Sequence, residues 1–400
     1  MRSPIAAVEA AAPASDSYTQ RFSVSYEYRV VFTRDVFAGG NPVLAEILTQ
    51  PTGLRAKLVV FVDDGLVSAD PGLLARIDAY AIAHKDVVDL VCFPEAVSGG
   101  EACKNDGGLV GSLQSRLVAL GIDRHAFVVA IGGGAFLDLI GFVAATVHRG
   151  IRHIRIPTTV LAQNDSGVGV KNGVNAFGQK NLLGTFVPPY AVLNDADFLL
   201  TLNSRDKRSG MAEAVKVALI RDASFFHWIE RNVDDLRAFQ APAVSFAIRR
   251  CAELHMDQIA SGGDPFERGS ARPLDFGHWS AHKLELLTKH TLRHGEAVAI
   301  GIALDARYST LRGYLPAGED QRIVSALQAL GLPIYHQALD SLDPQGGHNV
   351  LAGLRDFQDH LGGELSITLL RAIGSAVEVH EMHEPDILQS ISWLRQGGAL

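Results

Sequence analysis

The segment Ala126–Ala145, AFVVAIGGGAFLDLIGFVAA, decides the fold class of this chain. It begins with an apolar, β-branched run, passes through three glycines at 132–134 and continues as an apolar helical pattern that carries Asp138. Glycines between a strand and a helix let the backbone approach a pyrophosphate, whose charge the helix N-terminus favours. The same triplet can also be no more than a tight turn. The segment therefore predicts a strand–turn–helix unit of an α/β fold, with a dinucleotide site as one interpretation.

Further strands and helices alternate around this segment. Helical patterns at Pro71–His84 and Gly111–Leu120 separate short runs rich in β-branched residues. The runs expected to form buried strands are Lys57–Val62, Asp89–Phe93, Ala126–Ile131 and His153–Ile156. Such alternation predicts a parallel sheet that binds ligands at the carboxyl ends of its strands. Asp63, at the end of the first of these strands, is either a ribose-binding acid or a turn aspartate.

From about Gly210 the strand signal fades and helical periodicity dominates. The expected helices are Gly210–Ile220, Ala241–Ile259, His278–Thr288, Gly295–Tyr308 and Ile323–Leu330. We therefore expect a Rossmann-like dinucleotide-binding α/β domain at 18–200 and a mostly α-helical domain at 201–400, after a frayed extension at 1–17. The cleft between the two domains is the expected site.

The composition describes an ordinary globular protein, with 47% hydrophobic and 20% charged residues. A net charge of -8 without a block of Lys and Arg argues against nucleic acid as a partner. Three scattered cysteines without metal-ligand spacing fit a reducing cytosol. No run of apolar residues is long enough to predict a membrane span, and the N-terminal extension does not resemble a secretory signal. These features predict a cytoplasmic enzyme or binding protein.

A polar, Gly-rich run, DSGVGVKNGVNAFGQKN, spans Asp165–Asn181. Phosphate binding needs cations and amide donors held together, and this run supplies both. Long loops of this kind are commonly functional, although a solvated surface loop would have the same composition. We expect a loop that binds phosphate, with polar side chains from Asp165, Lys171, Asn172, Asn175, Lys180 and Asn181.

A second set of residues indicates a metal. His278 and His282 are four residues apart and so share one helical face, and His294 begins the next helical pattern. Glu213 and Lys216 lie three residues apart on an earlier helix. One carboxylate with two histidines leaves a coordination position open, as in catalytic zinc sites. A single histidine would more often be structural, but this combination predicts a divalent metal site.

Together and in this order, these motifs resemble those of the 3-dehydroquinate synthase family of sugar-phosphate cyclases. The resemblance runs from about Val59 to Gly374, and any one of its motifs is modest evidence, whereas the ordered set is highly specific. The motifs are GGEACKN (99–105), GGG with Asp138 (132–138), RGIRHIRIPTTVLAQNDSGVGVKNGVN (149–175), GQKNLLGTF (178–186), SGMAEAVK (209–216), DFGHWSAH (275–282) and HGEAVAIG (294–301).

The resemblance implies a reaction in which one bound NAD is used repeatedly. A hydroxyl of a sugar phosphate is oxidised, phosphate leaves, the carbonyl is reduced again, the ring opens, and an intramolecular aldol addition closes a carbocycle. A divalent metal, Zn²⁺ or Co²⁺, would polarise the alcohol and later the ketone, while the phosphate itself can take the proton. The resemblance also implies a homodimer in which Arg149 reaches the neighbouring subunit's site.

By position, the resemblance assigns roles to individual residues. The metal ligands would be Glu213, His278 and His294. The catalytic group would be Lys171, Lys216, His282 and Asp165. Further substrate contacts would come from Arg149, Asn181, His255, Asp275 and Arg272, with Arg268 as the alternative to the last because the loop before it differs in length. NAD would be bound by Asp63, Glu101, Lys104, Gly133, Gly134, Asp138, Thr158, Thr159 and Lys180.

At the substrate end the chain departs from true dehydroquinate synthases. His255 and the pair Gln358–Asp359 stand where those enzymes have lysines, and Asp275 stands where they have asparagine. Asp275 resembles the sedoheptulose 7-phosphate cyclases that make valiolone-type cyclitols, but GHWSAHKLE fits neither subgroup fully. The sequence therefore predicts sedoheptulose 7-phosphate as the substrate, with the carboxylated sugar acid of the shikimate pathway as the alternative.

Two other classes share part of this pattern. Metal-dependent alcohol dehydrogenases of the glycerol dehydrogenase type have a similar architecture, but a simple alcohol would not require the cations Arg149, Lys171, Lys180 and Lys216. An inactive NAD-binding sensor would gain nothing from a buried glutamate and two histidines, which are costly without a partner. Both are weaker predictions than a cyclase.

Overall fold

The computed structural model describes residues 17–177, 179–266, 273–360 and 363–398. The expected N-terminal extension therefore lies almost wholly outside the described residues. Within these ranges, no helix combines the length and the apolar character needed to cross a membrane.

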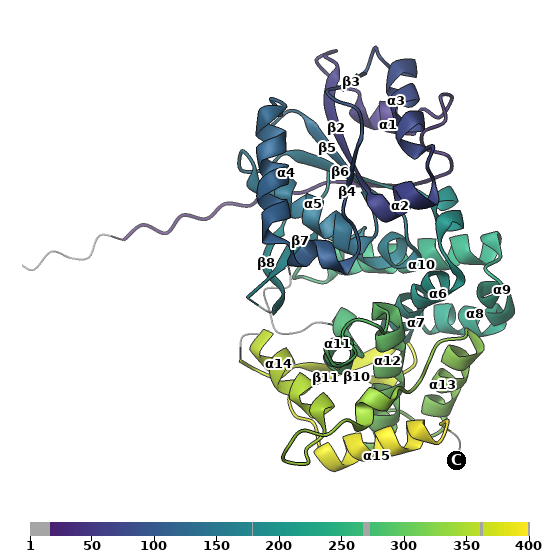
Figure 1. Ribbon diagram of the computed structural model, residues 1–400. Coiled ribbons are helices and arrows are strands. Elements are labelled where there is room, and N and C mark those ends of the chain that lie inside the picture. The colour runs from purple at the N-terminus through teal and green to yellow at the C-terminus, as the bar shows by residue number, and fades with distance from the viewer. Residues whose placement is uncertain (1–16, 178, 267–272, 361–362, 399–400) are drawn as a thin grey trace, which may run out of the picture.

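A parallel sheet forms the centre of the N-terminal half (Figure 1). Its strand order is β1-β9-β6-β5-β2-β3, and β4 also pairs with β2. The strands are β1 (Arg29–Thr33), β2 (Ala56–Asp63), β3 (Val88–Leu90), β4 (Glu95–Val97), β5 (Phe127–Gly132), β6 (Arg152–Pro157) and β9 (Ala191–Asp195). The predicted parallel α/β sheet is confirmed. The expected strand Asp89–Phe93 is wrong at its end, because β3 stops at Leu90. Pro94, which has no N–H to donate, lies between β3 and β4.

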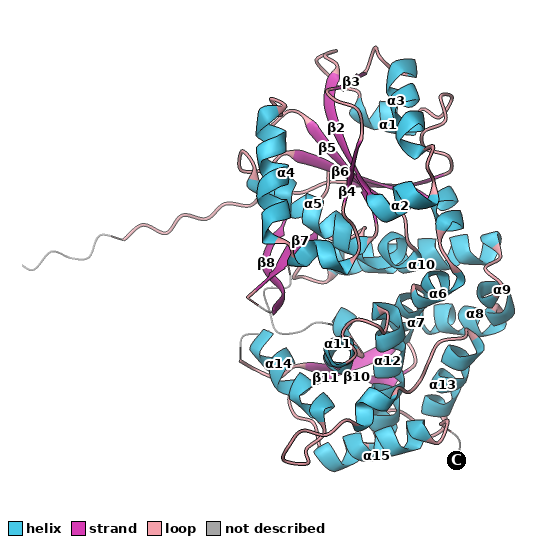
Figure 2. Cartoon of the chain, viewed as in Figure 1, coloured by secondary structure: helices cyan, strands magenta, loops and turns pink. Residues whose placement is uncertain are grey.

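Helices cover both faces of this sheet (Figure 2). They are α1 (Val43–Leu48), α2 (Asp64–Ala69), α3 (Leu73–Ala83), the 3-10 helix η1 (Glu101–Asn105), α4 (Gly107–Ala119) and α5 (Gly134–Thr146). Alternate residues of β5 enter different cores: Val129 packs with Ile77 of α3, and Val128 packs with Leu117 of α4. All six residues of β5 are buried, as expected of a central parallel strand.

The run Asp165–Asn181 is not the long loop that its composition predicts. It begins in a π-helical turn η2 (Ala162–Ser166) and continues as an antiparallel hairpin of β7 (Lys171–Ala176) and β8 (Gln179–Phe186). The hairpin packs closely on α5, since a Cβ added to Gly141 would collide with Asn172. Glycine and asparagine, which are poor strand formers, concealed this hairpin in the sequence.

The second half is mostly helical, as predicted. Its elements are η3 (Ala196–Thr201), α6 (Ser204–Ser209), α7 (Met211–Arg221), α8 (Ala223–Arg231), α9 (Val233–Arg237), α10 (Ala241–Ser261), η4 (Pro273–Asp275), α11 (His278–Leu287), α12 (His294–Leu311), α13 (Glu319–Ala329), η5 (Gln337–Asp340), η6 (Asn349–Leu351), α14 (Ala352–His360) and α15 (Glu384–Arg395). A two-stranded hairpin of β10 (Ile367–Ala372) and β11 (Ser375–Val379) was not expected. Its strands pack against α12 and α7, whose apolar side chains fill the core of this half.

Candidate active site

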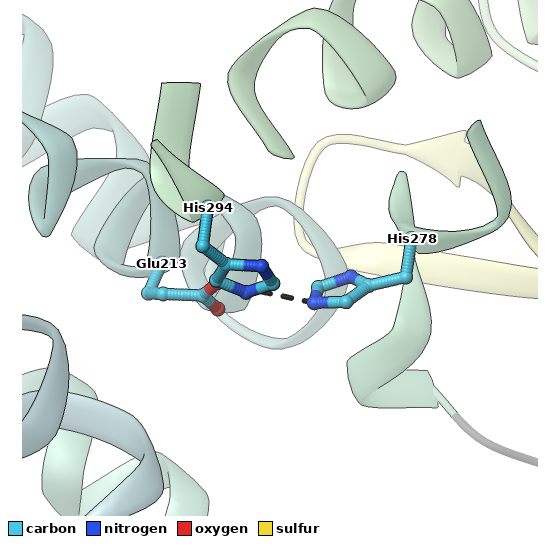
Figure 3. A group of neighbouring side chains, drawn as sticks. All are labelled: Glu213, His278 and His294. Carbon is cyan, nitrogen blue, oxygen red and sulfur yellow. Dashed lines mark ion pairs between the residues drawn. The ribbon is translucent and has the colours of Figure 1, made fainter. Parts of the chain in front are cut away.

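Three side chains from three helices form a candidate metal site: Glu213 of α7, His278 at the start of α11 and His294 at the start of α12 (Figure 3). One ligand atom of each lies within 4.8 Å of those of the other two. The Nε2 atoms of His278 and His294 lie 3.9 and 3.6 Å from Oε1 of Glu213. The residues that the sequence proposes as ligands therefore meet in space, although they are up to 81 positions apart along the chain — from 213 to 294.

Both imidazoles present the correct nitrogen. Nδ1 of His278 lies 3.1 Å from the carbonyl oxygen of Phe276, and Nδ1 of His294 lies 3.2 Å from Oε2 of Glu285. Each Nδ1–H can donate to its oxygen, which directs Nε2 toward the metal position. Burial opposes protonation of His294, but Glu285 and Glu213 raise its pKa to about 9, so a metal ion would displace a proton from its Nε2. Burial, together with the charge of Lys216, lowers the pKa of His278 to about 4, so its ring is neutral.

Glu213 provides the test of whether a cation fits here. Its side chain is fully buried, and neither carboxylate oxygen accepts a well-formed hydrogen bond from the described residues. Its close neighbour is the ammonium of Lys216, with which it forms an ion pair. Burial would raise the pKa of Glu213, but Lys216, His294 and His278 together outweigh it and bring the pKa to about 2. The ammonium of Lys216 contacts Oε2, whereas Oε1 faces both histidines and has no hydrogen-bond partner among the described residues. A buried carboxylate oxygen without a partner is costly, and a divalent ion would satisfy it.

Glu285 is a functional candidate that the sequence analysis missed. It lies on α11, nearly buried, and contacts both His294 and the ammonium of Lys180, whose Nζ is 3.2 Å from Oε1. His282, Glu285 and His294 also form a second set of possible ligands. Lys180 donates to both oxygens of Glu285, and Nδ1 of His294 contacts one of them, whereas Oε1 of Glu213 has no hydrogen-bond partner among the described residues, so the Glu213 set is the better metal site. The signal in the sequence is its spacing, three residues after His282 and seven after His278 on one helical face.

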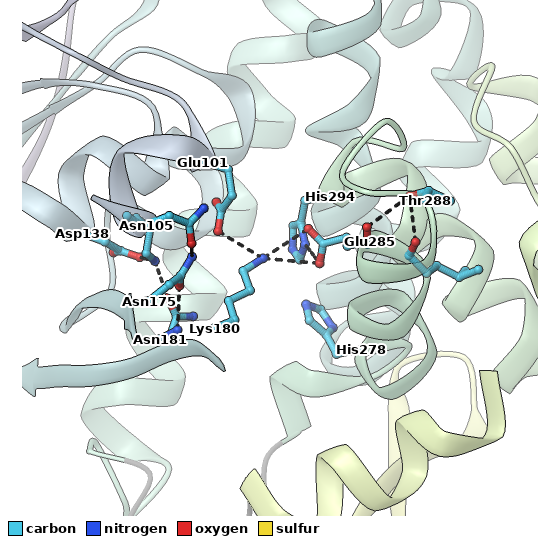
Figure 4. A network of polar contacts seen from close by, with 12 residues as sticks. Glu101, Asn105, Asp138, Asn175, Lys180, Asn181, His278, Glu285, Thr288 and His294 are labelled. Carbon is cyan, nitrogen blue, oxygen red and sulfur yellow. Dashed lines mark hydrogen bonds and ion pairs between the residues drawn. The ribbon is translucent and has the colours of Figure 1, made fainter. Parts of the chain in front are cut away.

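A network of polar contacts connects the β7–β8 hairpin with both halves (Figure 4). Lys180 lies between Glu285 of α11 and Glu101 of η1, 3.7 Å from the latter. Lys104 forms a 2.8 Å ion pair with Asp138 of α5 and also bonds to Asn181. Of the residues expected at the NAD site, Glu101 and Lys180 thus form a chain of contacts that reaches the candidate metal site through Glu285, and Lys104 and Asp138 form a separate group at Asn181, the residue after Lys180.

A second group of expected residues surrounds Lys216. Nδ1 of His255 on α10 lies 2.8 Å from Oδ1 of Asp165 in η2. Burial opposes ionisation of Asp165, but the charges of Lys216 and His255 hold its pKa well below the usual range. Burial would lower the pKa of Lys216, but Glu213 and Asp165 raise it, and Asp275 adds to this effect. His282 lies beside the same group, its ring 5.4 Å from that of His278.

The glycine turn lies where the sequence predicts it, between β5 and α5. Gly133 is the N-cap residue of α5, and no side chain caps the start of this helix among the described residues. Thr158 donates its backbone N–H to Gly132, and a Cβ added to Gly133 would lie 3.3 Å from Thr159. Asp63 ends β2, and its Oδ1 accepts the N–H of Gly65 at 2.9 Å, which is the role of a turn aspartate.

The remaining expected substrate residues are less close together. Arg149 is exposed in the turn before β6, at the opposite end of that strand from Thr158. Lys171 is exposed at the start of β7. Gln358 and Asp359 belong to α14, and Asp359 is exposed. Arg268 and Arg272 lie outside the described residues.

Known proteins resemble most of this chain. The family described as 3-dehydroquinate synthase matches with its N-terminal part over residues 95–209 and with its C-terminal part over residues 210–349. A 3-dehydroquinate synthase of Halorhodospira halophila is 36% identical over 336 residues, which cover 80% of this chain and 92% of that protein. A 2-epi-valiolone synthase of Actinosynnema mirum is 32% identical over 370 residues, 92% of each protein.

A solved structure agrees with the sequence comparisons. The 2-epi-5-epi-valiolone synthase of Streptomyces hygroscopicus subsp. jinggangensis, with NAD⁺ and Zn²⁺ bound, superimposes with a TM-score of 0.83 at 30% identity and covers 95% of this chain and 100% of its own. Both family parts, the relatives over most of their length and the shared fold lead to the same conclusion. This chain belongs to the 3-dehydroquinate synthase family.

Proposed function

We propose that this protein is a sugar-phosphate cyclase that uses NAD and one divalent metal ion, and that its substrate is sedoheptulose 7-phosphate. The observation that carries the proposal is Oε1 of Glu213, a buried carboxylate oxygen without a hydrogen-bond partner among the described residues, which faces Nε2 of His278 and of His294. The similarity to the structure of 2-epi-5-epi-valiolone synthase with NAD⁺ and Zn²⁺ bound supports both cofactors.

The metal would be held by Glu213, His278 and His294. The NAD pyrophosphate would bind at the start of α5, which has no side-chain cap among the described residues. When bound, the metal supplies a Lewis acid and NAD supplies a reversible hydride acceptor. Lys216, buried beside Glu213, would orient the reacting hydroxyls.

Other residues would hold the rest of the substrate. Lys171 and Asn181 would bind the phosphate, and Asp165, fixed by His255, would accept hydrogen bonds from sugar hydroxyls. Arg149 and Thr158 flank opposite ends of β6, so Arg149 is remote from the site that Thr158 would line. This placement supports a role for Arg149 in the site of a second subunit in a homodimer. We also propose a division near residue 200 into a nucleotide-binding and a metal-binding domain.

The substrate end favours a neutral group over a carboxylate. His255 is held by the carboxylate of Asp165, and Asp275 lies close enough to Lys216 to affect its pKa. A substrate carboxylate would therefore meet two acids. Each charge-assisted hydrogen bond that a lysine would make to it is worth roughly 1.5–3 kcal/mol. Losing two of them would cost roughly 3–6 kcal/mol, or about two to four decades in kcat/KM.

A direct competition tests the substrate. Sedoheptulose 7-phosphate and the carboxylated sugar phosphate of the shikimate pathway are supplied together to the zinc- and NAD-loaded protein, and cyclic products are followed by mass spectrometry. We expect faster formation of the cyclitol. Faster turnover of the carboxylated substrate would make this protein a 3-dehydroquinate synthase instead.

The cofactor cycle has its own test. Phosphate release should require NAD, while absorbance at 340 nm shows no net NADH. Stoichiometric NADH with an alcohol such as glycerol would instead favour the dehydrogenase alternative.

A further inference from the structure

Arg155 is a fully buried arginine at the centre of the sheet, on β6. No ion pair between its guanidinium and a carboxylate is found among the described residues. Its donors go almost entirely to one backbone segment. Nη1 lies 3.3, 3.2 and 2.9 Å from the carbonyl oxygens of Ser166, Gly167 and Gly169, and Nη2 donates to the carbonyl of Lys171 at 2.8 Å.

The remaining donors of Arg155 complete this arrangement. Nη2 also donates to Oδ1 of Asn172 at 2.7 Å, and Nε donates to Nε2 of His153 at 3.2 Å. Burial, together with the charge of Arg155, lowers the pKa of His153 well below its ordinary value, so its ring is neutral and Nε2 can accept. A planar guanidinium with five N–H groups suits such a set of acceptors, and a lysine ammonium does not.

Every carbonyl of the segment Ser166–Lys171 has a donor. Arg155 serves four of them, the hydroxyl of Tyr28 donates to Val168 at 2.8 Å, and the N–H of Val187 donates to Val170 at 3.0 Å. Most backbone carbonyls in a protein are satisfied by helices or sheets. Here one buried side chain replaces that pattern and fixes an irregular segment.

The burial of this charge has a cost. An ion removed from water loses several kcal/mol of solvation, which aligned carbonyl dipoles offset only if the geometry is good. An apolar residue on β6 would avoid that cost but would leave four carbonyls unsatisfied. The hydrogen bonds of Arg155 therefore fix the segment Ser166–Lys171, and its burial adds no stability to the sheet itself.

Two residues that the proposed function assigns to the substrate, Asp165 and Lys171, lie immediately before the segment and at its last position. Asp165 immediately precedes Ser166 and contacts His255, and Lys171 is its last residue. We propose that Arg155 is a positioning residue, which fixes Ser166–Lys171 and so sets the places of Asp165 and Lys171 relative to each other. This inference rests on the proposed function.

The test compares Arg155→Lys and Arg155→Met with Arg307→Lys and Arg307→Met. Arg307 of α12 is a matched control, a largely buried arginine that is ion-paired with Asp320 at 2.8 Å and stacked on Trp393, in the other half of the chain. All variants are loaded with zinc and NAD. The measurements are zinc content, NAD affinity, the affinity for inorganic phosphate by calorimetry, and kcat and KM for the sugar phosphate.

We expect Arg155→Lys to keep zinc and NAD but to lose about 10- to 100-fold in kcat/KM and in phosphate affinity, the size expected when catalytic groups move by about 1 Å. The Arg307 variants should lose stability alone. Wild-type phosphate affinity and kcat/KM in Arg155→Lys, or equal losses in Arg307→Lys, would overturn the proposal.

Three further variants separate the possible failures. Tyr28→Phe removes the hydrogen bond to the carbonyl of Val168 in the same segment and leaves every charge in place. It should therefore give a smaller loss of kcat/KM, and it can be measured even if the Arg155 variants do not fold. An unchanged kcat/KM would contradict the inference. Asp165→Asn and Lys171→Met test the proposed function directly. Full activity in both would show that the substrate roles are wrong, whatever Arg155 does.

Discussion

Trp279 and Asp305 meet where α11 packs on α12, and the indole Nε1 donates a 2.9 Å hydrogen bond to Oδ1 of Asp305. The other carboxylate oxygen accepts the backbone N–H of Gly277 at 3.1 Å. Gly277 and Trp279 are the two neighbours of His278 in sequence, so one buried carboxylate holds the backbone before a proposed metal ligand and the side chain after it. Burial raises the pKa of Asp305 to about 7, and these two hydrogen bonds limit the rise.

The first prediction is a pH dependence of stability that Asp305 causes. Its pKa is about 7 in the folded protein and about 3.9 when unfolded, so the folded state binds the proton more tightly. The stability that this group contributes is complete below about pH 4 and is lost as the pH rises through 7, by roughly 4 kcal/mol in total. Asp305→Asn has no such titration.

The measurement is urea unfolding of the wild type and Asp305→Asn at pH 4 and pH 8. The unfolding free energy of the wild type relative to the variant should be lower at pH 8. Other carboxylates cancel in this difference. Identical pH profiles for the two proteins would mean that Asp305 ionises normally.

The second prediction concerns Glu285. Glu285→Gln removes the charge that faces Nδ1 of His294, and loss of such a partner typically weakens metal binding 10- to 100-fold. Zinc affinity is measured by competition with a chelator. Glu296→Gln is the matched control, since Glu296 caps α12, the helix that begins at His294, and pairs with Arg205. An equal loss in the control would assign the effect to the helix end.

The third prediction separates the two possible ligand sets. His278→Ala should lower the zinc content sharply, and His282→Ala should leave it near the wild-type value, because only His278 belongs to the Glu213 set. Elemental analysis of the purified variants gives the answer. The reverse pattern would place the ion between His282, Glu285 and His294.

The fourth prediction uses Gly134. A Cβ there would collide with the hydroxyl of Ser166, which is buried and has no hydrogen-bond partner in the described residues. Gly134→Ala should therefore lower both the melting temperature and the NAD affinity. Adding Ser166→Ala should restore the melting temperature but not the NAD affinity, if the methyl group also blocks the dinucleotide. Recovery of both would show that Ser166 alone requires this glycine.

The sequence predicted those features that local pattern determines. The run before Gly132 forms β5, and the helical spacing of His278 and His282 places both on α11, because strand and helix periods are visible within a few residues. Glu213, His278 and His294 lie together in the structure; the residue pattern grouped Glu213 with three histidines, and the family motifs selected His278 and His294 among them. Whether they bind a metal stays a prediction.

What escaped prediction depends on tertiary contacts. The β7–β8 hairpin takes its shape from packing on α5 and from Arg155, and neither is encoded in the hairpin's own glycine-rich run. Glu285 has the appearance of an ordinary helical acid until α12 brings His294 to it. A buried arginine on a central strand likewise carries no signal, because its partners are backbone carbonyls rather than acids.

The pairing of β1 with β9 has a consequence for the order in which the protein can assemble during synthesis. The two strands pair from Arg29↔Ala191 to Thr33↔Asp195, and Asp195 accepts the backbone N–H groups of Asp35 and Val36, with 160 positions between Asp35 and Asp195. At about 5–20 residues per second, β1 waits on the order of 8–30 s for its partner to be translated. During that interval its unpaired edge is available to other chains. The earliest of the described strands to be synthesised is thus among the last to be ordered.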